Sequence, residues 1–149
     1  MMEATTIRVM QLRSQGWCCA QIVILLLLED LGREGPDLVR AARSLCFGLG
    51  DLAGPCGALT GGALALGLAA GGPAGDPKVD DRLRPLLAEL GAWFRRTMEA
   101  RHGGTSCRAI VGPGAEAPNP PHCGPAIMET YETILRLLSD HDIDPAAYA

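Results

Sequence analysis

The chain has 149 residues and a net charge of −4, and 48% of its residues are apolar although only 4% are aromatic. Its basic residues are interleaved with acidic ones, whereas a nucleic-acid surface or a polybasic membrane patch needs clustered lysine and arginine, so we expect neither kind of partner. A chain of this length can bury a core of leucine, alanine, valine and isoleucine without disulfides, and we expect a single domain over residues 1–149.

The first half of the chain predicts four helices and no strand, with the helices over residues 5–14, 17–31, 36–45 and 56–69. The second helix is apolar almost all round, which is typical of a helix inside a bundle rather than on its surface. The fourth is rich in glycine and alanine, and we expect it to lie at the centre with its neighbours packed close.

The second half of the chain predicts two further helices. A long amphipathic helix follows the turn at residues 75–77 and extends to Arg101, and a last helix covers residues 125–138. Residues 105–122 are expected to form a loop, and residues 140–149 a mobile tail. The sequence therefore predicts an all-α fold, a compact bundle of five or six helices with a glycine-rich central helix.

The uncharged segment at residues 52–75 is long enough to span a bilayer, but seven glycines lie between Gly54 and Gly72. Glycine at this density is typical of a tightly packed interior helix, so we expect no membrane insertion. The N-terminus lacks the basic and then apolar pattern of a secretory signal. We therefore expect a cytoplasmic protein in a reducing compartment.

The six cysteines are the most informative residues of the chain. In a reducing compartment such a set is more often metal-binding or catalytic than a disulfide framework. Cys18 and Cys19 open the second predicted helix, Cys56 opens the fourth, and Cys123 is the expected N-cap of the last. Unpaired N–H groups and the helix dipole stabilise a thiolate at such positions, which predicts lowered thiol pKa values. Cys107 differs, because it lies in the predicted loop.

A free cysteine also packs like a small hydrophobic residue, and Cys46 fits that alternative best. Cys18 fits it as well, since adjacent cysteines on a helix point about 100° apart and rarely reach one site. No pair has the C-x-x-C spacing, so a metal site would have to be assembled from distant segments. His102 and His122 lie close in sequence to the last two cysteines, which leaves a mixed cysteine/histidine zinc site as one alternative and ordinary helix-end histidines as the commoner one.

Two segments and two later cysteines carry a resemblance to a known family. The segments are Gly16-Trp17-Cys18-Cys19-Ala20-Gln21 and Gly54-Pro55-Cys56-Gly57-Ala58-Leu59-Thr60-Gly61-Gly62, and the later cysteines are Cys107 and Cys123. Over residues 11–138 the chain resembles the redox-active proteins named for their C-GCAxxG-C-C cysteine pattern. The resemblance implies redox activity, with Cys19, Cys56, Cys107 and Cys123 as the four functional cysteines.

This family is similar to a module of the split-Soret cytochromes, which carries an iron–sulfur centre beside haems. The chain has no C-x-x-C-H motif for haem attachment, so only the iron–sulfur centre could be shared. The resemblance therefore implies an iron–sulfur site on some or all of the four cysteines.

Three functions are compatible with these cysteines. The first is redox or electron-transfer activity, in which the four cysteines act as redox thiols or as ligands of a [2Fe–2S] cluster, for which four thiolates are the usual ligand count. We favour the cluster, because the sequence has no closely spaced dithiol that could act as an exchange motif on its own. The second is a structural zinc module without turnover, and the third is a plain helical interaction module that binds no metal. For the first function we expect a redox partner protein or a small-molecule oxidant or reductant. A homodimer is a further expectation.

Overall fold

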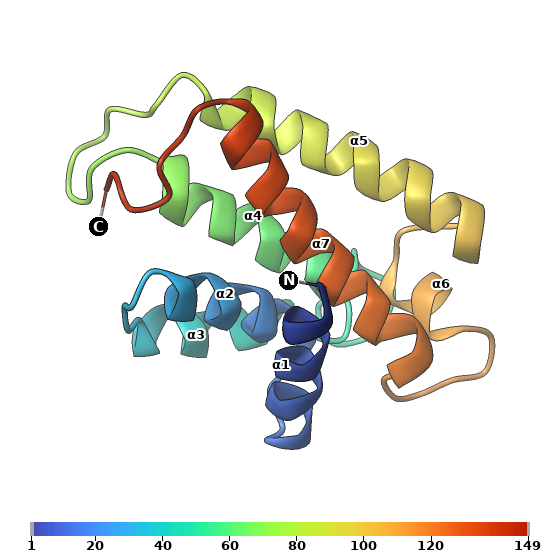
Figure 1. The fold of residues 1–149 in the computed structure, drawn as a ribbon. Coiled ribbons are helices and arrows are strands. Elements are labelled where there is room, and N and C mark those ends of the chain that lie inside the picture. The colour runs from blue at the N-terminus through green and yellow to red at the C-terminus, as the bar shows by residue number, and fades with distance from the viewer. Residues whose placement is uncertain (1, 149) are drawn as a thin grey trace.

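Helices form most of the described chain, which comprises residues 2–148 of a computed structural model (Figure 1). They are α1 (Met2–Ser14), α2 (Cys19–Asp30), α3 (Pro36–Ala42), the 3-10 helix η1 (Arg43–Leu45), α4 (Gly57–Ala70), α5 (Leu83–His102), α6 (Cys107–Val111) and α7 (Pro120–Asp140). No strand occurs between residues 2 and 148, so the all-α prediction is confirmed. This part of the chain has seven α-helices rather than five or six, because the expected loop at residues 105–122 contains α6.

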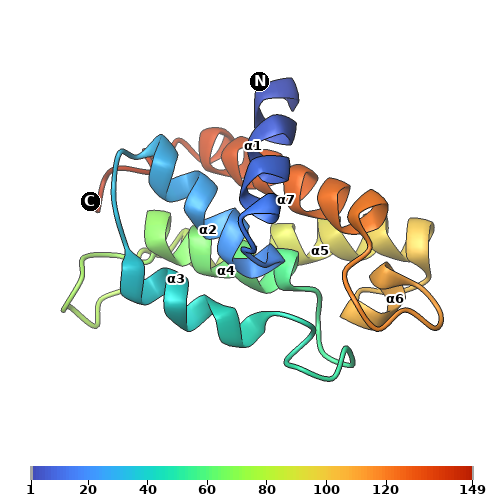
Figure 2. The ribbon, with the colours of Figure 1, turned by 90° about the horizontal axis from the view of Figure 1, so that it is seen from below.

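The main core lies between α2, α4, α5 and α7. Helix α4 packs against each of the other three, and α1 packs against α2 and α7 (Figure 2). The fully buried side chains include one large residue from each of the four helices, namely Leu27, Leu66, Phe94 and Ile134. Helix α3 packs against α2 and forms a second, smaller hydrophobic cluster with it. No helix among residues 2–148 has both the length and the apolar character needed to cross a bilayer.

Helix α4 approaches α2 so closely that a side chain at Gly61 would not fit. A Cβ atom built there would lie 2.6 Å from the carbonyl oxygen of Ala20 and 2.7 Å from its Cα. Both are backbone atoms of α2, which cannot turn away as a side chain could. Glycine at this position therefore allows the close approach of α2 and α4, the two helices that carry Cys19 and Cys56 at their starts.

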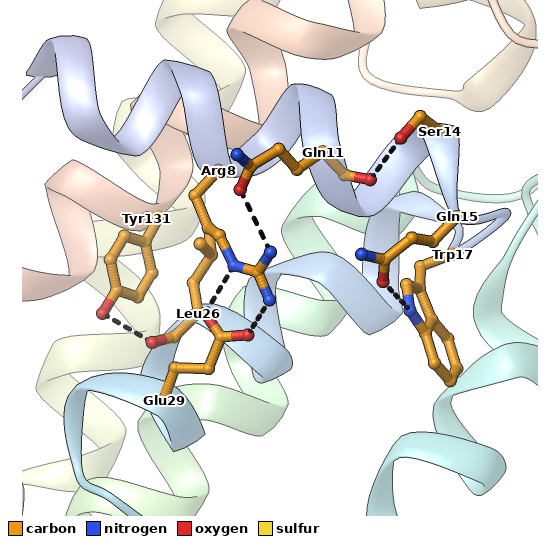
Figure 3. Close-up of polar contacts among 8 residues, drawn as sticks. All are labelled: Arg8, Gln11, Ser14, Gln15, Trp17, Leu26, Glu29 and Tyr131. Carbon is orange, nitrogen blue, oxygen red and sulfur yellow. Dashed lines mark hydrogen bonds and ion pairs between the residues drawn. The ribbon is translucent and has the colours of Figure 1, made fainter.

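Two polar contacts fasten neighbouring helices to α2 (Figure 3). The guanidinium of Arg8 in α1 donates to the carboxylate of Glu29, with Nε 2.9 Å from Oε2. The hydroxyl of Tyr131 in α7 lies 3.2 Å from the carbonyl oxygen of Leu26. It also contacts the carboxylate of Asp30, which Figure 3 does not draw. Burial, and then the hydrogen bond to Asp30, raises the pKa of the Tyr131 phenol, so the hydroxyl stays protonated and donates.

Replacing Tyr131 with phenylalanine is expected to lower the free energy of unfolding by about 1–2 kcal/mol, because the single phenolic O–H that α2 accepts from α7 is lost. The ring remains, so the packing of Tyr131, which is 2% exposed, is preserved. Urea unfolding measures this loss of stability as a lower midpoint concentration of urea, while the dependence of the free energy of unfolding on urea concentration stays unchanged. A midpoint equal to that of the wild type would show that these hydrogen bonds add nothing to stability.

The residues after α7, which we expected to form a mobile tail, contact the rest of the chain. Ile143 is buried, and the hydroxyl of Tyr148 donates to the carboxylate of Asp80 at 2.9 Å. Arg82 also binds this carboxylate, at 2.8 Å, and its hydrogen bonds hold the pKa of Asp80 well below the usual range. The segment before α5 is thereby joined to the C-terminal residues.

Candidate functional site

The six cysteines divide into one bonded pair and four free thiols. Cys18 and Cys46 form a disulfide with their Cα atoms 6.1 Å apart. The other four are free, and they are the four that we predicted as the site: Cys19, Cys56, Cys107 and Cys123. Packing was the alternative that fitted Cys46 best and Cys18 as well, but the two residues are also bonded to each other.

Each free cysteine lies at or near the start of a helix. Cys19 is the first residue of α2, Cys56 occupies the N-cap of α4, and Cys107 is the first residue of α6 rather than part of a loop. Cys123 was predicted to be the N-cap of the last helix. It lies inside α7 instead, because this helix begins three residues earlier, at Pro120. Proline suits the first helical positions, where its fixed φ fits and its missing N–H is not needed.

Backbone hydrogen bonds hold the segments of Cys56 and Cys107 side by side. The N–H of Cys56 donates to the carbonyl of Thr105 at 3.0 Å, and the N–H of Cys107 donates to the carbonyl of Gly54 at 2.9 Å. Ser106 caps α6, because its Oγ accepts from the N–H of Ala109 at 3.0 Å. These bonds bring together two cysteines that are far apart in the sequence.

The start of α4 is packed onto Cys19. A Cβ built on Gly57 would collide with the Sγ of Cys19 and would lie 3.3 Å from the backbone nitrogen of Ala20. The residue after Cys56 therefore has to be small for the Cys19 thiol to keep its place. This contact joins Cys19 to the pair formed by Cys56 and Cys107.

Three of the free thiols border one cavity of about 250 Å³, which we call the thiol pocket. Its walls are Arg13, Gly16, Trp17, Cys18, Cys19, Phe47, Cys107, Val111, Pro118 and Cys123. Cys56 is buried and does not line the cavity, yet its pKa is affected by charge on Cys19 and on Cys123. Charge on Cys123 also affects Cys19 and Cys107, so the four thiols form one electrostatically coupled group.

Burial raises the pKa of Cys19 to about 11 and that of Cys56 to about 12. Backbone N–H groups at the two helix starts act in the opposite direction, but their effect is smaller than that of desolvation. Burial also raises the pKa of Cys107. The prediction of lowered pKa values is therefore wrong for Cys19 and Cys56. The pKa of Cys107, for which no lowering was predicted, is raised as well, so all three thiols are protonated at neutral pH when no metal binds them.

The two histidines predicted as alternative zinc ligands lie against each other. The ring centroids of His102 and His122 are 4.8 Å apart, and the Nδ1 of His122 lies 2.9 Å from the carbonyl oxygen of Ile110. Burial, and then the neighbouring His122, lowers the pKa of His102. Within residues 2–148 no three or more His, Cys, Asp or Glu side chains are grouped as metal ligands, so a mixed cysteine/histidine zinc site is not seen there.

The fold and the site define an all-α protein with four coupled free thiols at the starts of four helices. The family described as "Putative redox-active protein (C_GCAxxG_C_C)" matches residues 17–137. The chain belongs to this family, as the resemblance implied. No curated protein and no solved structure matches the chain significantly.

Three features at the pocket escaped the sequence reasoning. The Cys18–Cys46 bond joins residues 28 positions apart, and no spacing rule pairs them. Arg13 and Phe47 line the pocket from segments in which we proposed no functional residue. The one sequence signal for these features was Arg13, which lies near the end of the first helix and a few residues before Cys18 and Cys19.

Proposed function

We propose that the protein is an electron-transfer protein whose centre is a [2Fe–2S] cluster held by Cys19, Cys56, Cys107 and Cys123. The observation that carries the proposal is the division of the cysteines: the four of the family pattern are free and coupled, while the two others are bonded to each other. A bound cluster supplies one-electron chemistry, and four cysteine ligands are its usual complement.

The chemistry of the donor set fits such a centre. Thiols are soft ligands, and a bound metal deprotonates them even where burial opposes the charge. Because no metal-ligand grouping is found within residues 2–148, the side chains would have to turn toward a common point when they bind. All four lie at or near helix starts, and rotation about their own Cα–Cβ bonds would redirect the sulfurs.

The chain's own groups have defined tasks around the sulfurs. The N–H groups of Ala20 and Gly57 lower the pKa of the Cys19 thiol, and those of Ala58 and Leu59 lower the pKa of the Cys56 thiol. Such donors stabilise negative charge on sulfur and so favour the reduced state of the centre. The side chains of Trp17 and Phe47 form part of the pocket wall.

Dithiol/disulfide cycling among the same four cysteines is the less favoured form of this redox function. Exchange begins from a thiolate, and burial disfavours the thiolate at Cys19 and Cys56. A structural zinc ion without turnover is the alternative from another class, and metal analysis distinguishes it. We place the protein in the cytoplasm, with a redox protein or a small oxidant or reductant as partner, and a homodimer stays an expectation.

Replacing Cys56 with alanine is expected to remove nearly all bound iron and acid-labile sulfide, because a four-thiolate centre loses one of its ligands. The matched control is Cys46→Ala, since Cys46 is equally buried but lies outside the set of free thiols. The control should keep its iron and its visible absorbance. A folded Cys56→Ala protein with wild-type iron and sulfide content would contradict the proposed centre.

A further inference from the structure

The Cys18–Cys46 disulfide is a second sulfur site, outside the four free cysteines. Cys18 occupies the N-cap of α2, and Cys46 directly follows η1. The side chain of Gln21, which is 1% exposed, ties these two segments together. Its Nε2 donates to the carbonyl of Val39 at 2.9 Å, and its Oε1 accepts from the N–H of Cys18 at 3.3 Å. The two cysteines are thus held near each other by more than their own bond.

Because these contacts hold α2 and α3 together without the disulfide, the Cys18–Cys46 bond can be reduced and re-formed reversibly. Val39 and Ala42 of α3 are buried against Ile24 and Leu28 of α2, so the two backbones stay in place when the disulfide is reduced. The Sγ of Cys46 lies 3.8 Å from the carbonyl oxygen of Ala42, which can accept a hydrogen bond from the released thiol. Both states of the pair therefore have a defined place in the fold.

Only one of the two cysteines lines the pocket into which a thiol could enter. Cys46 is 4% exposed, whereas Cys18 is half-buried and lines the thiol pocket. A thiol in the pocket therefore attacks the sulfur of Cys18, and Cys46 is the leaving group. The cavity has a volume of about 250 Å³, which can hold a small-molecule thiol but not a protein segment.

The pocket also selects the charge of its ligand. Arg13 is the single charged side chain in its wall, and no ion pair to Arg13 occurs among the described residues. The other walls include the apolar side chains of Trp17, Phe47 and Val111. A guanidinium without a partner beside apolar walls favours a small molecule that carries an anionic group.

We propose that the Cys18–Cys46 pair exchanges with a small anionic thiol, which binds in the thiol pocket through Arg13. The thiolate of the ligand bonds to the sulfur of Cys18, the Cys18–Cys46 bond breaks, and Cys46 leaves with the electron pair and takes up a proton. A second thiol then attacks the ligand sulfur, which releases the ligand disulfide and the thiol of Cys18. In sum, two ligand thiols are oxidised to one disulfide while the protein disulfide is reduced to two thiols. This activity goes beyond the proposed electron-transfer centre, although Cys19, Cys107 and Cys123 of that centre also border the thiol pocket.

The test compares three two-carbon thiols that differ in the charge of the head group: 2-mercaptoethanesulfonate, 2-mercaptoethanol and cysteamine. Each is added to the purified protein at equal thiolate concentration, and reduction of the Cys18–Cys46 bond is followed by alkylation and peptide mass spectrometry. The anionic thiol should react about tenfold faster than the cationic one, a ratio that corresponds to about 1.4 kcal/mol. Arg13→Gln should remove this preference. The matched control Arg95→Gln should keep it, because Arg95 is exposed on α5 and lies outside the pocket.

A second variant identifies the attacked sulfur. In Cys46→Ser, the disulfide of 2-mercaptoethanesulfonate should leave one stable adduct, on Cys18. The proposal is overturned if the wild type shows no charge preference, if Arg13→Gln retains it, or if the adduct forms on Cys19, Cys107 or Cys123 instead. Cys56→Ala separates the two proposals, since it should lose the metal centre and keep the charge-dependent exchange.

Discussion

Replacing Gly61 with alanine is expected to lower the free energy of unfolding by about 3 kcal/mol, a large effect for one methyl group. The added Cβ would lie 2.6 Å from the carbonyl oxygen of Ala20 and 2.7 Å from its Cα. Neither atom can rotate out of the way, so α2 and α4 must separate along their whole contact. Chemical denaturation monitored by circular dichroism measures the loss.

Gly67 provides the control within the same helix. Nothing lies within 4 Å of a Cβ built there, and its backbone is helical. Gly67→Ala should therefore raise the free energy of unfolding by about 0.5–1 kcal/mol, because alanine is the better helix former. If both variants shifted stability in the same direction, the close approach of α2 to Gly61 would not be a property of the folded protein.

The second large effect is expected at Gly57, where alanine should empty the candidate centre while the fold persists. The new Cβ would collide with the Cys19 sulfur, which is the end of a short side chain and can rotate away, and would lie 3.3 Å from the backbone nitrogen of Ala20. The helix loses little, since Gly57 is the first residue of α4 and alanine suits a helix. We expect Gly57→Ala to lose most of its iron and sulfide and to unfold at nearly the wild-type midpoint.

Gly124→Ala is the matched control for this prediction. Gly124 also adjoins a candidate ligand, Cys123, but nothing lies within 4 Å of a Cβ built on it. The control should retain the centre. A Gly57→Ala protein with the full metal content of the wild type would show that the Cys19 sulfur does not need the position that it has beside α4.

Local signals in the sequence predicted the fold where glycine and proline mark the ends of helices. Helix α4 was expected at residues 56–69 and runs from Gly57 to Ala70. Helix α7 was expected to begin at Pro125, because Pro120 and Pro121 were read as part of a loop, whereas they occupy its first two positions. Helix α6 was missed because it has five residues, although Ser106 caps it in the usual way.

The candidate site shows the same division between local and tertiary information. The four cysteines were proposed from their places in the predicted helices and from the family pattern, and all four are free thiols in the structure. The pKa values of these cysteines could not be predicted in the same way. The expectation of a lowered pKa at a helix start takes no account of burial, and burial outweighs the effect of the N–H groups at Cys19 and Cys56. The Cys18–Cys46 bond depends on the packing of α3 against α2, which no pairing rule for cysteines supplies.

The central claim, a cluster on four free cysteines, is tested most directly by anaerobic purification followed by a visible spectrum and by quantification of iron, zinc and acid-labile sulfide. The account predicts iron and sulfide in equal amounts, two of each per chain as a [2Fe–2S] centre requires, together with absorption bands in the visible region. Stoichiometric zinc without colour, or a colourless protein free of iron, would contradict it and would assign the four thiols to a structural site or to dithiol chemistry.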